Sequence, residues 1–212
     1  MNPAELDHIV VAGATLAQAI EYVADLTGVA PRPGGRHVAM GTHNAVVRLG
    51  TRVYLELIAT DPGLPRPPRP RWFDLDDPAL QAELGDRPRV IHWVARTADL
   101  ERTVARAKVD PGRIHPMSRG DFRWRITIPD DGRRPAGGVL PTLIHWDVAR
   151  HPADGLPDDR VSLVELAASH PDPAAIRAAL AALGLPDALR VTYGAAPRLV
   201  AMLRTPRGLV TL

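Results

Sequence analysis

The chain has 212 residues, of which 45% are hydrophobic, and a formal net charge of +2. It contains no cysteine, which excludes disulfide scaffolds, thiolate metal sites and cysteine nucleophiles. Every apolar stretch is shorter than the roughly 20 residues that span a bilayer, and residues 1–5 lack the start of a secretory signal. The arginines are scattered and form no basic stripe, which argues against nucleic-acid binding. We therefore expect a cytoplasmic protein with neither nucleic acid nor membrane as a partner.

Residues 1–60 predict a module of one strand, one helix and three further strands. The short β-branched segment 6–11 predicts the first strand. Thr15 as N-cap and Gly28 as C-terminal stop enclose a helix with apolar residues at helical spacing. After a turn at 31–35, strands are predicted at 37–41, 43–49 and 52–59. A linker at 61–87 follows, because residues 61–71 are rich in proline and arginine; a helix is predicted within it at 78–84.

The same pattern returns in a second module, residues 88–150. At an offset of 84 residues, Leu6 falls on Val90 and His8 on His92 without a gap. A helix is predicted behind Asp99, with strands at 113–117, 122–128 and 143–146. The match indicates an internal duplication.

Residues 151–212 predict a third strand–helix–strand unit that covers or completes the sheet. A strand at 161–166 precedes a helix that ends at Gly184, and strands follow at 189–193, 199–203 and 209–212. In all three units the strands after the helix return as antiparallel hairpins, so the predicted fold class is α+β.

Several strings resemble the glyoxalase-like domain of the vicinal oxygen chelate superfamily. They are Leu6-Asp7-His8, 34–37, 41–44 and 54–58, with further likeness at 93–97 and 144–146. The resemblance covers most of residues 6–150. It implies paired βαβββ modules that form a cupped mixed sheet around a central cavity, with the helices outside.

The resemblance also implies a divalent metal, Zn, Ni, Mn or Fe(II), held by nitrogen and oxygen ligands. Carried over by position, the ligands would be His8, Glu56, His92 and His145, and Glu56 and His145 would move the proton. His145 stands where the family usually has a glutamate, and the 84-residue offset places Glu56 on Leu140 instead. The alternative is structural: strand histidines often make ordinary hydrogen bonds, and Glu56 could pair with an arginine.

Two groups of polar residues are candidates for substrate binding. His37, Thr42 and Asn44 belong to the strings that resemble the family, although Asn44 could equally tie a turn to the backbone. In segment 122–128 the arginines Arg123 and Arg125 share one face of a strand and the apolar residues share the other. They would select an anion if that face lines the cavity, and would be a hydrated surface if it faces solvent.

The leading functional hypothesis is a small-molecule enzyme, acting as a metal-assisted lyase, isomerase or dioxygenase on an oxygenated substrate. The alternative is a protein that binds or sequesters a small molecule, such as an antibiotic, without metal or turnover. Unpaired sheet edges would favour a homodimer.

Overall fold

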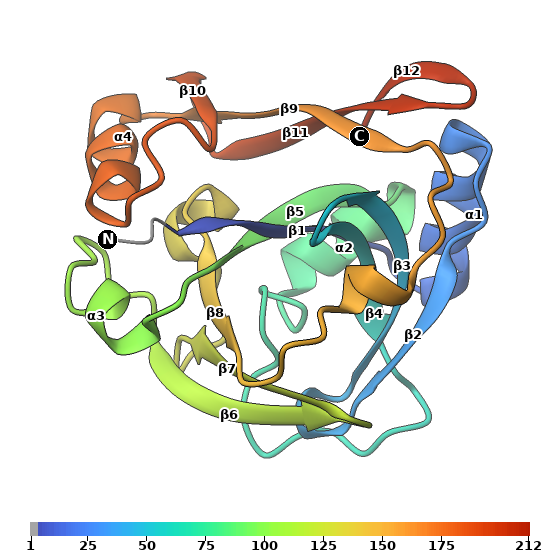
Figure 1. Cartoon of the computed structure of the whole chain (residues 1–212), viewed down its shortest axis with the longest axis horizontal. Helices are drawn as coiled ribbons and strands as arrows, with labels where there is room; N and C mark the ends of the chain where they lie inside the picture. Colours follow the sequence, from blue (N-terminus) through green and yellow to red (C-terminus); the bar gives the residue numbers. More distant parts are fainter. Residues whose placement is uncertain (1–3) are drawn as a thin grey trace.

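The computed structural model describes residues 4–212, which form two β-sheets with helices packed outside them (Figure 1). Residues 1–3, which belong to the predicted first module and to the segment searched for a secretory signal, lie outside the described residues. The first module contains β1 (Glu5–Ala12), α1 (Leu16–Thr27), β2 (Arg32–His37), β3 (Thr42–Gly50) and β4 (Val53–Thr60).

The rest of the chain contributes two further groups of elements. The second group is α2 (Pro78–Asp86), β5 (Arg89–Arg96), α3 (Leu100–Val104), β6 (Arg113–Arg119), β7 (Phe122–Ile128) and β8 (Thr142–Trp146). The third group is β9 (Ser162–His170), α4 (Pro173–Ala182), β10 (Arg190–Tyr193), β11 (Arg198–Thr205) and β12 (Gly208–Thr211). None of the helices within residues 4–212 has the length and apolar character needed to cross a bilayer.

The larger sheet has eight strands in the order β2-β3-β4-β1-β5-β8-β7-β6. The two modules join where β1 pairs with β5 in antiparallel fashion. The sheet curls until its edge strands β2 and β6 come near each other, so it forms a half-barrel with an interior. The predicted α+β fold with a cupped mixed sheet is confirmed.

Local signals in the sequence explain how α1 begins and ends. The Thr15 side chain accepts a hydrogen bond from the backbone N–H of Gln18, as an N-cap residue does. Gly28 ends the helix with φ 74°, a left-handed conformation in which glycine carries no steric penalty.

One strand lies earlier in the chain than predicted. The segment 31–35 was expected to turn, yet β2 runs through it, and Val38–Met40 form a 3-10 helix instead of a strand. Because β2 is an edge strand, the missing N–H of Pro33 leaves no broken ladder bond. A bulge between Pro33 and Gly35 adjusts the register with β3.

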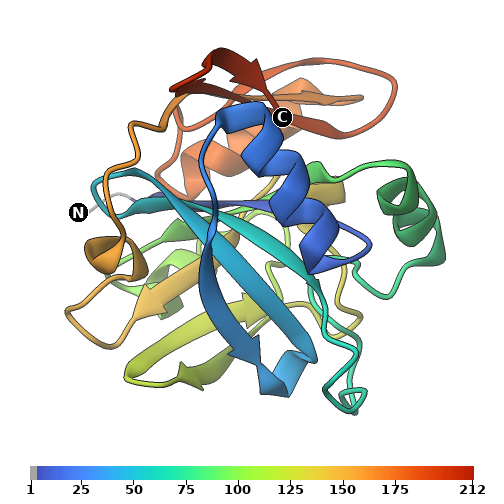
Figure 2. The same ribbon diagram turned by 90° about the vertical axis from the view of Figure 1, so that its right-hand side faces the viewer.

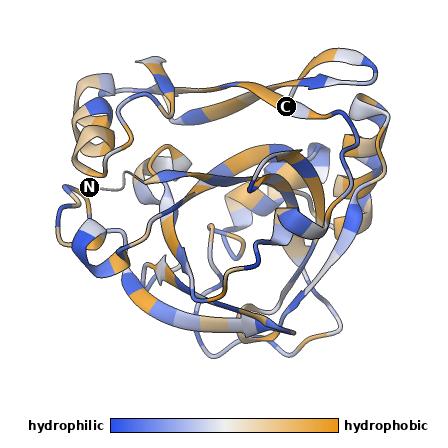
Figure 3. Cartoon of the chain, viewed as in Figure 1, coloured by the Kyte–Doolittle hydropathy of each residue, from blue (hydrophilic) through white to orange (hydrophobic). Residues whose placement is uncertain are grey.

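Two apolar cores pack on opposite faces of the larger sheet. In β1, Ile9 and Val11 face the outer core with α1 and the second sheet, whereas Val10 and Ala12 face the core inside the cup. A central strand that is buried on both faces is expected to be apolar throughout. Figure 3 shows β5 mostly hydrophobic and β6, which is more exposed, alternating in character.

The third unit covers the larger sheet and does not extend it. Its strands form a separate four-stranded sheet in the order β10-β9-β11-β12. This sheet lies as a layer over the outer face of the half-barrel (Figures 1 and 2). Buried side chains such as Leu166, Leu180 and Leu203 join the outer core. The physical reason is that the outer face of β1 and β5 is apolar and needs a cover.

Candidate functional site

His8 is held in place by its neighbour Asp7. Alternating residues of a strand point to opposite faces, but a bulge lies between Leu6 and His8 in the pairing with β5. It allows the Asp7 carboxylate to lie beside the His8 ring, with Asp7 Oδ1 2.7 Å from His8 Nδ1. The ring also stacks on Tyr54, with centroids 4.6 Å apart.

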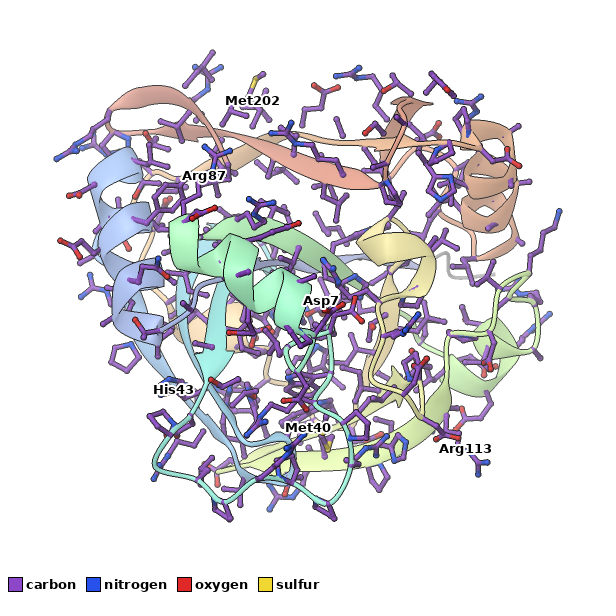
Figure 4. The ribbon with its side chains drawn as sticks, turned by 180° about the vertical axis from the view of Figure 1, so that it is seen from behind. Asp7, Met40, His43, Arg87, Arg113 and Met202 are labelled. Atoms are coloured by element: carbon purple, nitrogen blue, oxygen red, sulfur yellow. The ribbon has the colours of Figure 1, made fainter. Side chains whose placement is uncertain are left out.

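Asp7 is fully buried and accepts three hydrogen bonds (Figure 4 labels it in the interior). Besides His8, the donors are Trp146 Nε1 at 2.9 Å and His151 Nε2 at 3.1 Å. Burial by itself would raise the pKa of Asp7, but the hydrogen bonds from His151 and His8 outweigh it and lower that pKa well below its usual value. Asp7 is therefore ionised, and His8 donates to it through Nδ1.

That arrangement directs the unprotonated Nε2 of His8 towards Glu56. Glu56 lies on β4, and its Oε2 is 3.6 Å from His8 Nε2. Its other oxygen, Oε1, accepts a hydrogen bond of 2.5 Å from Asn44 Nδ2 on β3. A carboxylate oxygen and an imidazole lone pair that face each other repel unless one of them carries a proton. At 3.6 Å the two atoms are beyond hydrogen-bond distance of each other, and both side chains line the same pocket.

Arg119 links the two edges of the half-barrel. From β6 its Nη1 donates to His37 Nε2 at 2.8 Å on β2 and to Asn44 Oδ1 at 3.2 Å on β3. Since His37 accepts at Nε2, its Nδ1 carries the proton and donates to Thr42 Oγ1 at 3.1 Å. Burial, followed by the charge of Arg119, lowers the pKa of His37 to about 3, so this ring is neutral.

These side chains line a nearly filled pocket inside the cup. Its volume is about 20 Å³, room for about one water molecule. Trp72 and Phe73, from the segment between β4 and α2, plug it, and their rings stack with centroids 5.2 Å apart. The lining residues are His8, His37, Asn44, Tyr54, Glu56, Trp72, Phe73, Arg119, Trp124, Ile126, Ile144 and Trp146.

His92 is not brought to the pocket. It is fully buried; Nε2 accepts from the Thr142 backbone N–H at 3.2 Å and Nδ1 lies 3.2 Å from Gly138 O. Burial, with a smaller effect from Arg134, lowers its pKa to about 3. Both ring nitrogens have protein partners, so His92 has no lone pair for a metal.

The strand register shows which residue of the second module corresponds to Glu56 of the first. In the first module Val10 of β1 pairs with Glu56, and in the second Val94 of β5 pairs with Thr142. Val94 is the residue 84 positions after Val10, so the counterpart of Glu56 is Thr142, not His145. Thr142 Oγ1 lies 3.0 Å from His92 Nε2, where the first module has His8 and Glu56.

His145 and the two arginines of β7 also lie outside the pocket lining. His145 Nδ1 is bonded to Thr97 O at 2.9 Å. Arg123 donates to the carbonyl of Phe122 at 2.8 Å, and Arg125 pairs with Glu101 and with Asp147. The apolar face of β7, through Trp124 and Ile126, lines the pocket instead. Trp146 occupies that interior side of β8.

Several polar and aromatic residues of the site are not predicted by the sequence. Asp7 lies in a string that resembles the family, but its orientation depends on a bulge. His151, Arg119 and Trp72 reach the site from a 3-10 helix start, an edge strand and a linker. Only the Leu6-Asp7-His8 string, an acid beside a histidine, could have been noticed beforehand.

Gly34 lies close to the site because a side chain there would collide with Asn44. A Cβ on Gly34 would lie 2.1 Å from Asn44 Oδ1. We expect Gly34→Ala to displace Asn44 and lower the free energy of unfolding by about 1–3 kcal/mol, as measured by urea denaturation. Gly50→Ala is the matched control, since no atom lies within 4 Å of its Cβ. Equal stability of the two variants would contradict the prediction.

Two paired βαβββ modules curled into a cup are the fold of the vicinal oxygen chelate class. The chain belongs to the glyoxalase-like domain family, whose model matches residues 6–184. No sequence among curated proteins matches the chain.

Solved structures share the fold at low sequence identity. A hypothetical protein from Staphylococcus aureus is similar with a TM-score of 0.64 and 12% identity, over 92% of this chain and 88% of that one. Methylmalonyl-CoA epimerase from Mycobacterium tuberculosis has 23% identity and a TM-score of 0.40, over 69% and 89% of the two chains. A mutant of 4-hydroxymandelate synthase from Streptomyces coelicolor has 15% identity and a TM-score of 0.48, over 100% and 63%.

Proposed function

We propose that the chain is a vicinal oxygen chelate enzyme that moves a proton at a carbon next to a carbonyl group, as an isomerase or lyase on a small oxygenated substrate. The observation that carries the proposal is the pair His8 Nε2 and Glu56 Oε2, 3.6 Å apart in a buried pocket. Such a pair is suited to general acid–base catalysis.

Each residue has a distinct part in this reaction. The Glu56 carboxylate accepts the proton from the carbon, and the electron pair of the C–H bond passes to the carbonyl oxygen to form an enolate. His8, held by Asp7, shares that proton with Glu56 and returns it. Arg119 supplies a positive charge near the enolate, and it is the only arginine or lysine that lines the pocket within the described chain.

A divalent metal does not fit the donor set. Catalytic zinc sites have three protein ligands, and of the four predicted ones only His8 and Glu56 converge. No group of three or more His, Asp or Glu side chains able to hold a metal occurs in residues 4–212. The Arg119 guanidinium, bonded to Asn44, also disfavours a cation next to Glu56. The ferrous dioxygenase chemistry that needed His92 is therefore not part of the proposal.

Exchange of carbon-bound protons tests the proposal without knowledge of the substrate. Incubation in D₂O with a panel of small carbonyl compounds, including pyruvate and hydroxyacetone, is followed by proton NMR. We expect the protein to accelerate exchange in at least one compound, and Glu56→Gln to reduce that rate at least about 100-fold. Gln keeps the acceptor for Asn44, so the variant should fold. Exchange at the wild-type rate in Glu56→Gln would overturn the proposal.

Metal analysis separates this reaction from a metal-dependent one. Protein purified without a metal-binding tag is measured for metal content, alongside His8→Ala and Glu56→Ala. One equivalent of metal in the wild type that is lost from both variants would contradict the metal-free proposal.

A non-catalytic binding protein is the second candidate, because aromatic rings of Trp72, Phe73, Trp124 and Trp146 surround the pocket. Tight binding of a flat molecule with no exchange in any compound would favour it. The homodimer and the cytoplasmic location stay predictions from the sequence, and light scattering would test the dimer.

A further inference from the structure

Trp72 has a buried hydrogen-bond donor without a partner. The residue is 4% exposed and lines the pocket, and its Nε1 has no acceptor among the described residues. Buried polar groups in proteins are nearly always hydrogen-bonded, so an orphaned donor inside a pocket calls for an explanation. Two other buried or half-buried indoles are hydrogen-bonded: Trp146, which lines the pocket, donates to Asp7, and Trp93, which lies outside the pocket lining, donates to Val139 O at 2.9 Å.

Arg119 also has donors to spare. Both of its hydrogen bonds, to His37 and Asn44, come from Nη1. Its Nε and Nη2 make no hydrogen bond to any residue within 4–212, and its stem lies along Gly35, where a Cβ would approach Arg119 Cδ to 2.8 Å. The guanidinium is therefore fixed in place while part of its donor set remains free. A planar group of this kind matches the two oxygens of a carboxylate.

We infer that Arg119 and the indole N–H of Trp72 bind a carboxylate on the substrate. The inference rests on the proposed function and specifies its substrate class: small acids with a carbonyl beside the carboxylate, whose adjacent carbon faces Glu56. Two donors that line the same pocket and both lie beside His37, one charged and one neutral, satisfy both carboxylate oxygens. Asn44, bonded to both Arg119 and Glu56, sets the spacing between the anion site and the base.

The segment that carries Trp72 must move to admit such an acid. A volume of about 20 Å³ does not hold a three-carbon molecule. Phe73 and Asp74 adopt positive φ angles of 61° and 58°, a conformation that disfavours residues with side chains. The segment of Trp72, Phe73 and Asp74 therefore has a strained backbone. A carboxylate that gives Trp72 its missing acceptor would stabilise the segment in an opened position.

Trp72→Phe tests the inference because it removes the donor and keeps an aromatic ring. Binding of pyruvate and of hydroxyacetone, which has CH₂OH in place of the carboxylate, is measured by calorimetry in a Glu56→Gln background that prevents turnover. We expect pyruvate to bind at least tenfold more tightly than hydroxyacetone. Trp72→Phe should weaken pyruvate about tenfold, leave hydroxyacetone unchanged, and leave the thermal midpoint unchanged or higher, because an unsatisfied buried donor is removed.

Trp93→Phe is the matched control. Its indole N–H has a partner, so the variant should lower the thermal midpoint and leave pyruvate binding unchanged. A purely structural role for Trp72 would make Trp72→Phe behave like Trp93→Phe, which would overturn the inference. So would equal affinity for the two ligands, or equal weakening of both by Trp72→Phe.

The inference and the proposed function can fail separately. Proton exchange confined to hydroxyacetone and other neutral carbonyl compounds would support the proposed function and contradict the carboxylate site. Tight pyruvate binding that depends on Trp72, without exchange in the wild type, would support the carboxylate site and contradict the proposed function.

Discussion

Asp7→Asn is expected to lower the free energy of unfolding by about 3–5 kcal/mol, the range for breaking a buried charged pair. The carboxylate accepts hydrogen bonds from His8, His151 and Trp146, and it is fully buried. An asparagine has a single acceptor oxygen, and its NH₂ group would face one of these N–H donors. At least one donor, His8 when the amide oxygen takes the place of Oδ2, would then face the NH₂ group in a site that water does not reach.

The same substitution is expected to slow the proposed proton transfer about 100-fold or more, since the orienting carboxylate of a catalytic histidine fixes its tautomer. Without Asp7, His8 no longer keeps its proton on Nδ1, and Nε2 no longer faces Glu56 unprotonated. The exchange rate is measured in D₂O below the melting temperature of the variant.

Asp130→Asn is a suitable control for both measurements. Asp130 pairs with Arg113 at the surface, with Arg113 Nε 3.1 Å from Asp130 Oδ2. An exposed pair of this kind contributes about 1 kcal/mol or less. If Asp7→Asn and Asp130→Asn were equally stable, or if Asp7→Asn exchanged protons at the wild-type rate, the role assigned to Asp7 would be wrong.

Acid is expected to destabilise the protein well before its carboxylates titrate. The pKa values of His37 and His92 are lowered to about 3 by burial, with Arg119 and Arg134 as further causes. In the unfolded chain both have the ordinary histidine pKa of about 6.5. Between these values the unfolded state binds more protons, so stability is full above about pH 6.5 and falls as the pH decreases towards about 3.

At pH 5 each histidine is expected to lower the free energy of unfolding by about 2 kcal/mol, and the two together by about 4 kcal/mol. Urea denaturation from pH 8 to pH 5 measures the slope. NMR signals of the two rings should stay in their neutral form down to about pH 4 while the protein is folded. His92→Gln should reduce the change in the free energy of unfolding between pH 8 and pH 5 by about half. A flat stability profile between pH 7 and pH 5 would show that neither ring is held neutral.

The elements that were predicted well depend on interactions between near neighbours in the chain. Helix α1 begins where Thr15 caps it and ends where Gly28 turns the backbone. The sequence of β1 returns in β5 at an offset of 84 residues, and these two strands pair with each other in the sheet. The repeat therefore indicates two modules that are joined through their first strands. Edge strand β2 was misplaced because Pro33 and two glycines are typical of turns, and only its position at the edge of the sheet permits them to form a strand.

The sequence by itself determined the strand and helix order, the duplication and the family, and it named His8 and Glu56 as candidate site residues. Tertiary structure decided which partners they have. A one-residue bulge turns Asp7 towards His8. The pairing of β5 with β8 puts Thr142, and not His145, in the position that corresponds to Glu56. The curl of the sheet brings Arg119 across to His37 and Asn44. The bulge in β1, the register of β5 with β8 and the curl of the sheet all depend on pairing between segments that are far apart in the chain. Local sequence patterns therefore do not predict them.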